Sequence, residues 1–371
     1  PISSNPETNE IGIGHEYTGN ATIETQPYEK IEFTGAAREY FGIWIVNIIL
    51  SVCTLGIYSA WAKVRRETYF KNNTRMLGVG LGYHATGGQI LKGRLIAGAV
   101  LVTVNIVISF DPRFGLATIP IFVFLAPWVL NVSMRFSARM SSYRNIRFNW
   151  HGTYWKSLWF LVISPLVGLL SLGLLTPLIS KSYYTYFASS HSYGTTKFNA
   201  SPRVREFYYA YLVGGILPAA LLGCTIFLLT IFGRAIGQEY TGSFWPGASL
   251  GGIWSTGIVA IYAFIFSMAF IYSVLCRNLM VKSLRLSEVS RFDSKINPFK
   301  FIWIYFSNLF LIIISLSLLV PWAKVRMYNY LSNATLIQIN DDLEQFVDQA
   351  QATQSSLGEA LADFEGVELT V

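Results

Sequence analysis

The chain has 371 residues, of which 52% are hydrophobic and only 13% are charged, and its formal net charge is +7. Soluble domains carry about 25% charged residues, so this composition excludes an ordinary soluble enzyme. A disordered chain is also excluded, because aromatic residues make up 15% of the sequence and would drive collapse. The composition indicates a membrane protein.

The charges are divided along the chain. Residues 1–39 hold seven acidic and two basic residues, residues 336–371 hold eight acidic and no basic residues, and residues 40–335 hold 26 basic and six acidic residues. The basic residues flank apolar segments, which favours the lipid bilayer and its anionic lipids as partners over nucleic acid. The polar, acidic start of the chain predicts no cleavable signal peptide.

Seven apolar runs follow one another along the chain. A helix that spans a bilayer needs about 20 residues, with a range of about 17–25, and the second and third runs lie at the short end of that range. Because backbone polar groups must be paired inside a bilayer, we predict helices in all seven and an all-α fold class, a polytopic helical membrane bundle. In chain order the runs are Tyr40–Ala62, Leu95–Phe110, Leu116–Val132, Trp155–Ile179, Tyr211–Phe232, Leu250–Cys276 and Phe299–Ala323.

One sequence unit occurs three times. A shift of 261 residues superimposes Trp61–Arg65 on Trp322–Arg326, and a shift of 144 residues relates the middle of the chain to its end. In the middle copy, Leu178–Lys181 replaces the Trp-Ala-Lys-Val signature. The second shift pairs Trp159 with Trp303, Pro177 with Pro321, and Tyr186 with Tyr330.

The repeats predict five regions. These are an acidic cytoplasmic N-terminal segment (1–39), a first membrane repeat (40–147), a second (148–291), a partial third (292–335) and an acidic amphipathic tail (336–371). In the tail, apolar residues recur at helical spacing, which predicts two short helices that pack on the basic face of the protein or dock a partner. These residues are Leu343, Phe346, Val347 and Ala350, then Leu357, Ala360, Leu361 and Phe364.

The positive-inside rule distinguishes two topologies. If all seven runs cross the membrane, the basic loops fall on both sides. If the first run of each repeat is re-entrant or half-buried, four crossings remain, both termini are cytoplasmic, and 24 basic residues lie inside against two outside. Breakers such as Gly56, Gly173 and Pro321 in the second half of these runs support this second topology. We favour it, and seven plain crossings stay as the alternative because the rule is statistical.

Two segments resemble the YjgN family of bacterial inner-membrane proteins. They are Leu55–Arg65, with the following Tyr69, Asn72 and Thr74, and Leu357–Asp363 in the tail. The resemblance covers nearly the whole chain and implies a multi-pass protein of the bacterial inner membrane. Because the family was defined as a domain of unknown function, the resemblance supplies no catalytic residues.

Two sets of residues are candidates for a functional role. Asn47, Ser164 and Asn308 are polar residues at equivalent positions of the three repeats, and they form either a polar path between repeats or hydrogen bonds between helices. The second set follows two of the apolar runs and forms either an interfacial anchor or a contact to anionic lipid. Its members are Trp61, Lys63, Arg65, Trp322, Lys324 and Arg326.

The sequence predicts no enzymatic chemistry. The four histidines and three cysteines show no metal-ligand spacing, and no nucleotide-binding or nucleophile motif occurs, so we predict no catalytic residue, no metal and no cofactor. Two functions remain. One is a transport or channel-like protein for a small solute or lipid, although runs without Asp or Glu argue against ion-coupled pumping. The other is a membrane-embedded scaffold or regulatory subunit that binds a protein partner, or a second copy of itself, through its basic loops and acidic tail.

Overall fold

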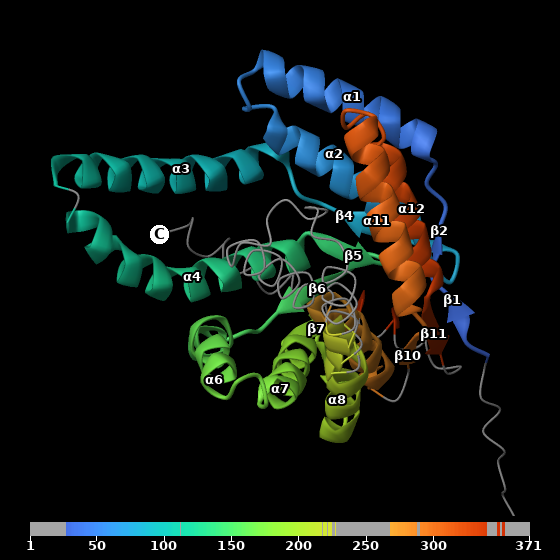
Figure 1. Ribbon diagram of the computed structural model, residues 1–371. Coiled ribbons are helices and arrows are strands. Elements are labelled where there is room, and N and C mark those ends of the chain that lie inside the picture. Colours follow the sequence, from blue (N-terminus) through green and yellow to red (C-terminus); the bar gives the residue numbers. More distant parts are fainter. Residues whose placement is uncertain are drawn as a thin grey trace, which may run out of the picture.

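A computed structural model describes residues 27–111, 113–216, 218–220, 222–224, 227, 268–287, 290–339, 347–348 and 351–352. Helices and short strands alternate along these residues (Figure 1). The helices are α1 (Ala37–Cys53), α2 (Ser59–Asn72), α3 (Gly87–Phe110), α4 (Arg113–Arg139), α5 (Tyr154–Leu158), the π-helix η1 (Trp159–Ile163), α6 (Ser164–Leu170), α7 (Thr176–Ser189), α8 (Val204–Tyr211), the π-helix η2 (Leu212–Ile216), a helix over 268–283, α11 (Pro298–Ile314) and α12 (Val320–Asn333). The strands are β1 (Glu29–Lys30), β2 (Glu32–Phe33), β3 (Thr74–Met76), β4 (Val79–Tyr83), β5 (Ser141–Tyr143), β6 (Ile146–Trp150), β7 (His191–Tyr193), β8 (Thr196–Ala200), β9 (Leu284–Leu286), β10 (Ser290–Ser294) and β11 (Thr335–Ile339).

The strands form one antiparallel sheet with the order β1-β11-β10-β9-β8-β7-β6-β5-β4-β3-β2. The two end strands, β1 and β2, are separated in sequence only by Ile31, whose backbone N–H donates to the Thr335 carbonyl at 3.0 Å. One chain segment therefore pairs with β11 through its first half and with β3 through its second half. This shared segment bends the sheet into a nearly closed, barrel-shaped ring, which we call the β-ring.

The prediction of an all-α fold was wrong, because the β-ring contains 11 strands. The strands are two to five residues long, as in Ser141–Tyr143 and Ile146–Trp150, and they lie in the basic segments between apolar runs. Alternation of apolar and polar residues over so few positions does not predict a strand. Strands β3 to β11 each pair with a neighbour on both sides, and β1 and β2 each pair on one side, so their backbone groups are satisfied through pairing between segments far apart in the sequence.

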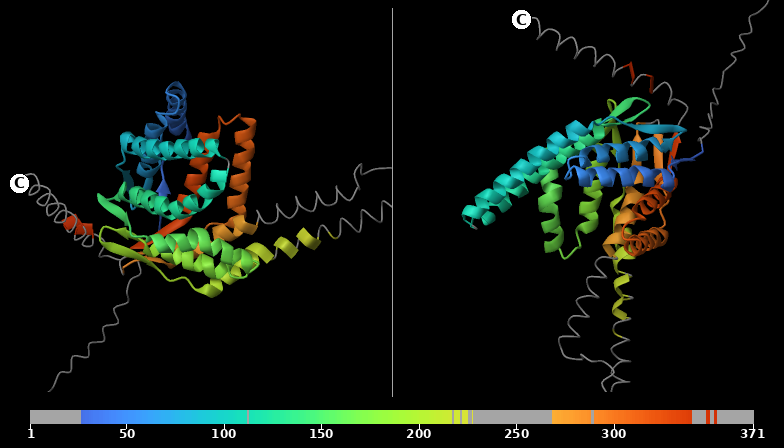
Figure 2. Two further views of the ribbon diagram at one scale, coloured as in Figure 1. Left: turned by 90° about the vertical axis from the view of Figure 1, so that its left-hand side faces the viewer. Right: turned by 90° about the horizontal axis from the view of Figure 1, so that it is seen from above.

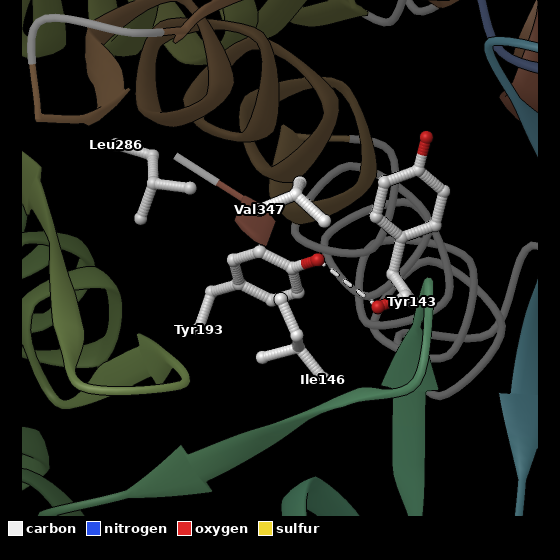
Figure 3. Close-up of a cluster of buried hydrophobic side chains, with 5 residues drawn as sticks. All are labelled: Tyr143, Ile146, Tyr193, Leu286 and Val347. Atoms are coloured by element: carbon white, nitrogen blue, oxygen red, sulfur yellow. Dashed lines mark hydrogen bonds between the residues drawn. The ribbon is translucent and has the colours of Figure 1, made fainter. Parts of the chain in front are cut away.

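Hydrophobic side chains fill the β-ring. Tyr143, Ile146, Tyr193 and Leu286 are at most 6% exposed and form one buried cluster (Figure 3). The Tyr193 hydroxyl donates to the Tyr143 carbonyl at 3.0 Å, and the Tyr143 hydroxyl donates to the Met76 carbonyl at 2.9 Å. Burying these aromatic rings gives the strands of the β-ring a shared hydrophobic core.

Helical hairpins connect neighbouring strands of the β-ring. Four of them are closed at the base by a backbone hydrogen bond from the third residue before the first helix to the residue just before the next strand. These bonds run from Thr34 N to Asn73 O, His84 N to Met140 O, His151 N to Ser190 O, and Lys295 N to Ala334 O, at 2.7 to 2.9 Å. In addition, α8 leaves the ring after β8 and 268–283 returns to it before β9. Figure 2 shows the helical arms grouped around the axis of the sheet.

The hairpins have two lengths. α3 and α4 contain 24 and 27 residues, and at 1.5 Å per residue they are about 36 and 40 Å long. They extend well away from the β-ring (Figure 1), and together with Val204–Cys224 they are long and apolar enough to cross a membrane. By contrast α1, Tyr154–Leu170 and α11 have 17 residues each, or about 25 Å. That is less than the hydrocarbon thickness of about 30 Å.

The three short hairpins reverse at equivalent residues. Their turns contain Leu55, Leu172 and Leu316, with φ of 50°, 52° and 49°, each followed by a second residue of positive φ. That second residue is glycine in the first two hairpins, where no Cβ opposes a left-handed backbone. The apolar runs Tyr40–Ala62, Trp155–Ile179 and Phe299–Ala323 therefore double back and do not form straight crossings.

Candidate functional site

The two candidate asparagines bind the two candidate arginines. Arg65 Nη1 donates to Asn47 Oδ1 at 3.5 Å, and Arg326 Nη1 donates to Asn308 Oδ1 at 3.0 Å. Asn308 also donates to the Ala323 carbonyl at 3.1 Å. Asn47 and Asn308 are only 8% and 7% exposed, so each arginine satisfies an oxygen that lies in apolar surroundings. The polar and anchor residues singled out from the sequence thus meet in pairs across the arms of one hairpin.

The middle hairpin has lost both members of this pair. Ser164 stands at the asparagine position, and its hydroxyl donates to the Phe160 carbonyl of its own helix at 2.9 Å. Ser182 stands at the arginine position, and it donates to the Leu178 carbonyl at 2.9 Å. Each of the three equivalent polar residues, Asn47, Ser164 and Asn308, is thus bonded within its own hairpin.

Three repeated tyrosines fasten the bases of the short hairpins. The hydroxyls of Tyr69, Tyr186 and Tyr330 each donate to the carbonyl of the residue 33 positions earlier. The distances are 2.8 Å to Ala36, 3.4 Å to Thr153 and 3.0 Å to Asn297. These carbonyls directly precede the first helix of each hairpin. The tyrosine repeat seen in the sequence therefore marks a contact that all three short hairpins use to hold their two arms together at the β-ring.

The two candidate tryptophans lie partly against protein and partly outward. Trp61 is 39% exposed and packs on the start of α3, where a Cβ at Gly87 would clash with the indole ring. Trp322 is 38% exposed, and the Arg326 guanidinium lies 5.0 Å from the centre of its ring. Lys63 and Lys324 are half-buried beside them. An aromatic ring with one packed and one exposed face suits the level of lipid headgroups.

Basic residues gather at the base of the helical arms. In the helices that the structure describes, every Lys and Arg except Arg113 lies within ten residues of the β-ring end of its arm, or within about 15 Å. We call this zone the basic belt. Burial, together with the belt residues Arg135 and Arg139 and with Lys197 on β8, lowers the pKa of His151. The base of the arms therefore carries a positive potential that favours anions.

A buried polar network links the membrane-length helix α4 to the middle hairpin. Asn131 on α4 donates to Ser157 Oγ at 2.8 Å and accepts from Trp150 Nε1 at 2.9 Å. Ser157 Oγ also lies 3.1 Å from the Tyr186 hydroxyl. Sequence reasoning missed this network, although an asparagine inside the apolar run Leu116–Val132 was a signal for it.

The acidic tail reaches the β-ring. Val347 is 5% exposed and belongs to the buried cluster of the ring, and Gln351 Nε2 donates to the Arg144 carbonyl at 2.9 Å. Residues 347–348 and 351–352 are helical, and the predicted second tail helix at Leu357–Phe364 lies outside the described residues. The packing of Val347 agrees with the interpretation that the tail packs on the protein itself.

Apolar helices of membrane-spanning length, three short apolar hairpins and a basic belt at the base of the arms define the class: an integral membrane protein whose helical hairpins start and end at a β-ring. The chain belongs to the family described as "Bacterial protein of unknown function (DUF898)", whose model matches residues 28–364.

The relatives carry one name. The chain is 22% identical to "Inner membrane protein YjgN" of Salmonella typhimurium over 379 residues, which is 88% of this chain and 92% of that protein. It is 28% and 27% identical to proteins of the same name from Escherichia coli O157:H7 and Escherichia coli K12, over 38% of this chain and 37% of each relative. No solved structure matches the chain. These matches confirm the predicted YjgN family and the bacterial inner membrane.

Proposed function

We propose that the protein is a lipid-handling transport protein of the bacterial inner membrane, which lets lipid headgroups cross beside its three short hairpins. In this proposal the β-ring, both termini and the basic belt are cytoplasmic. The long helices α3 and α4, and the pair that includes α8, cross the bilayer. The three short hairpins enter and leave from the cytoplasmic face.

The exposed tips of the short hairpins carry the proposal. Leu55, Leu172 and Leu316 are 95%, 90% and 88% exposed. A leucine at an exposed loop tip is unfavourable in water and favourable in hydrocarbon. A hairpin of about 25 Å that starts at the headgroups ends inside the hydrocarbon, which is about 30 Å thick. Its tip then faces lipid in place of water.

The asparagine–arginine pairs give such a hairpin a polar stripe. Asn47 and Asn308 each lie ten residues into their helix, or about 15 Å from the β-ring. A charged group at that depth draws in water and thins the bilayer locally. Thinning beside a short hairpin lowers the barrier to a headgroup that crosses from one leaflet to the other. The proposed activity needs no covalent chemistry and no ion gradient.

A flux assay tests this function. The full chain is reconstituted in vesicles that contain a fluorescent phospholipid in both leaflets, and an impermeant reductant is added outside. We expect nearly all the fluorescence to be lost with the wild-type protein and about half with empty vesicles. The variant Asn47→Leu/Asn308→Leu should slow the loss. If this variant leaves lipid and small-solute flux unchanged, the polar stripe does not form part of a path.

A second candidate function is a membrane-embedded regulatory subunit. The specific observation in its favour is that Val347 of the acidic tail completes the buried cluster of the β-ring. A partner that binds the tail would have to expose this cluster. Deleting 340–371 should then change the set of proteins that co-purify with the chain, and an unchanged set would contradict the regulatory role.

A further inference from the structure

A groove lies between the two arms of the middle short hairpin. It has a volume of about 540 Å³ and is lined by residues of α5, η1 and α7. Phe160 and Tyr186 stack between the arms with ring centres 5.2 Å apart. At the equivalent of Phe160 the first hairpin has Ile43, and the third has Ile304. The large rings separate the arms of the middle hairpin and form part of the groove lining.

Two lysines line this groove without a local counter-charge. Lys156 lies 5.8 Å from the centre of the Tyr186 ring, and Lys181 lines the groove from α7. Residues 112–205 contain ten basic residues and neither Asp nor Glu. In the part of the chain that the structure describes, neither lysine forms an ion pair. Two cations that share one groove create an attraction for an anion.

The middle copy departs from the repeat in a way that creates this charge pair. The first and third copies place their cations at Lys63 and Arg65 and at the equivalent Lys324 and Arg326. The middle copy moves its cation to the position between them, and one residue along a helix turns a side chain by about 100°. Lys181 is that cation.

In the other two hairpins, the position of Lys181 is occupied by a valine that packs against a neighbouring helix. Val325 is 9% exposed and packs with Tyr40 and Phe70. Val64 packs against the cluster of Ala60 and Ile90. The first and third hairpins therefore use this face for packing, whereas the middle hairpin presents a cation there.

The remaining lining residues suit a lipid headgroup. Trp155 and Trp159 are 75% and 45% exposed, and exposed indole rings lie preferentially at the membrane interface. The hydroxyl of Thr185 is buried at the groove and has no hydrogen-bond partner in the described part of the chain. A bound phosphate oxygen could accept a hydrogen bond from it.

We propose that this groove binds the headgroup of an anionic phospholipid of the cytoplasmic leaflet, with Lys156 and Lys181 on its phosphate and the two indole rings against its glycerol and upper acyl region. The inference rests on the proposed function, since it requires the groove to lie at the cytoplasmic headgroup level. It identifies the lipid class that would enter the path.

Lipid binding to the purified full chain tests the site. Native mass spectrometry in detergent would compare phosphatidylglycerol with phosphatidylcholine. We expect wild-type protein to bind phosphatidylglycerol at least about tenfold more tightly. Lys156→Gln/Lys181→Gln should abolish that preference, because each lysine attracts an anionic headgroup. The matched control Lys295→Gln/Lys300→Gln removes the same charge from the third hairpin and should keep the preference. Equal loss in both variants, or no loss in the first, would overturn the site.

Two further measurements test whether binding depends on charge and whether the ligand is a lipid or free phosphate. Lys156→Arg/Lys181→Arg keeps both charges and should keep the preference, so its loss would contradict a charge-based site. Inorganic phosphate at millimolar concentration should not displace the lipid, and full displacement would assign the groove to free phosphate. Binding is measured without flux. A wild-type protein that binds phosphatidylglycerol but moves no lipid would therefore contradict the proposed function and leave this site standing.

Discussion

Replacing Asn308 by leucine tests the interaction between the two arms of a short hairpin. Asn308 is 7% exposed, accepts from Arg326 at 3.0 Å and donates to the Ala323 carbonyl at 3.1 Å. Leucine has a similar size but leaves the arginine and the carbonyl without these partners. Leaving a buried polar group unsatisfied costs about 1–3 kcal/mol, and side-chain hydrogen bonds between membrane helices average about 0.6 kcal/mol. We therefore expect Asn308→Leu to lower the free energy of unfolding by about 1–2 kcal/mol.

Denaturant titration in mixed micelles measures this free energy. The matched control is Ser164→Ala in the middle hairpin, which removes a hydroxyl that donates only to its own helix and should cost about 0.5 kcal/mol or less. Arg326→Leu and the double variant complete a double-mutant cycle, for which we expect a coupling energy of about 0.5–1.5 kcal/mol. A coupling energy of zero, or equal effects of Asn308→Leu and Ser164→Ala, would refute the pairing.

Three other predictions concern pH, the tail and the hairpin tips. Burial and nearby cations lower the pKa of His151 below its usual 6.5, so the unfolded chain binds a proton more readily than the folded protein. The free energy of unfolding should therefore fall as pH drops below about 6.5. The variant His151→Gln should make the thermal unfolding temperature less sensitive to pH. Truncation after Ile339 removes Val347 from the β-ring, so a cysteine introduced at Leu286 should react with maleimide several-fold faster; an unchanged rate would contradict the tail contact. Leu316→Asp places a carboxylate on a tip in hydrocarbon at a cost of about 2.5–3.5 kcal/mol. It should reduce the amount of membrane-inserted protein, whereas Val79→Asp on the β-ring should not, and equal yields would argue against a buried tip.

The sequence predicted the hairpins better than it predicted the ring. The predicted breakers Gly56 and Gly173 lie in the turns at Leu55 and Leu172, because a left-handed backbone that uses glycine leaves a local signal. Pro321 lies in the first turn of α12, just after the turn at Leu316. The strands left no such signal. Ser141–Tyr143 and His191–Tyr193 are three residues each, and they become strands only because segments far apart in the sequence close the sheet.

In the candidate site too, the sequence predicted individual residues but not the long-range contacts between them. Asn47 and Asn308 were identified as buried polar residues, and Arg65 and Arg326 as anchors, yet their pairing requires the chain to fold back between them. Each pair is separated by 18 residues, which would span about 27 Å along a continuous helix. The groove was not predicted, because in the sequence the lysine at position 181, where the other copies have valine, indicates only that the middle repeat has diverged. The packing of Val64 and Val325 shows that this helix face contacts a neighbouring helix in the first and third hairpins, whereas Lys181 lines the groove in the middle hairpin.

Cysteine accessibility tests most directly whether the β-ring is cytoplasmic and the short hairpins return to it. In a chain with Cys53, Cys224 and Cys276 replaced by serine, one cysteine is placed at Lys197 on β8 and, separately, at Arg113, the first residue of α4. Both positions are exposed. Cells with a permeabilised outer membrane are treated with an impermeant maleimide. We predict modification at position 113 in intact cells and at position 197 only after the inner membrane is opened. Modification at position 197 in intact cells would contradict the proposed topology and the lipid path that depends on it.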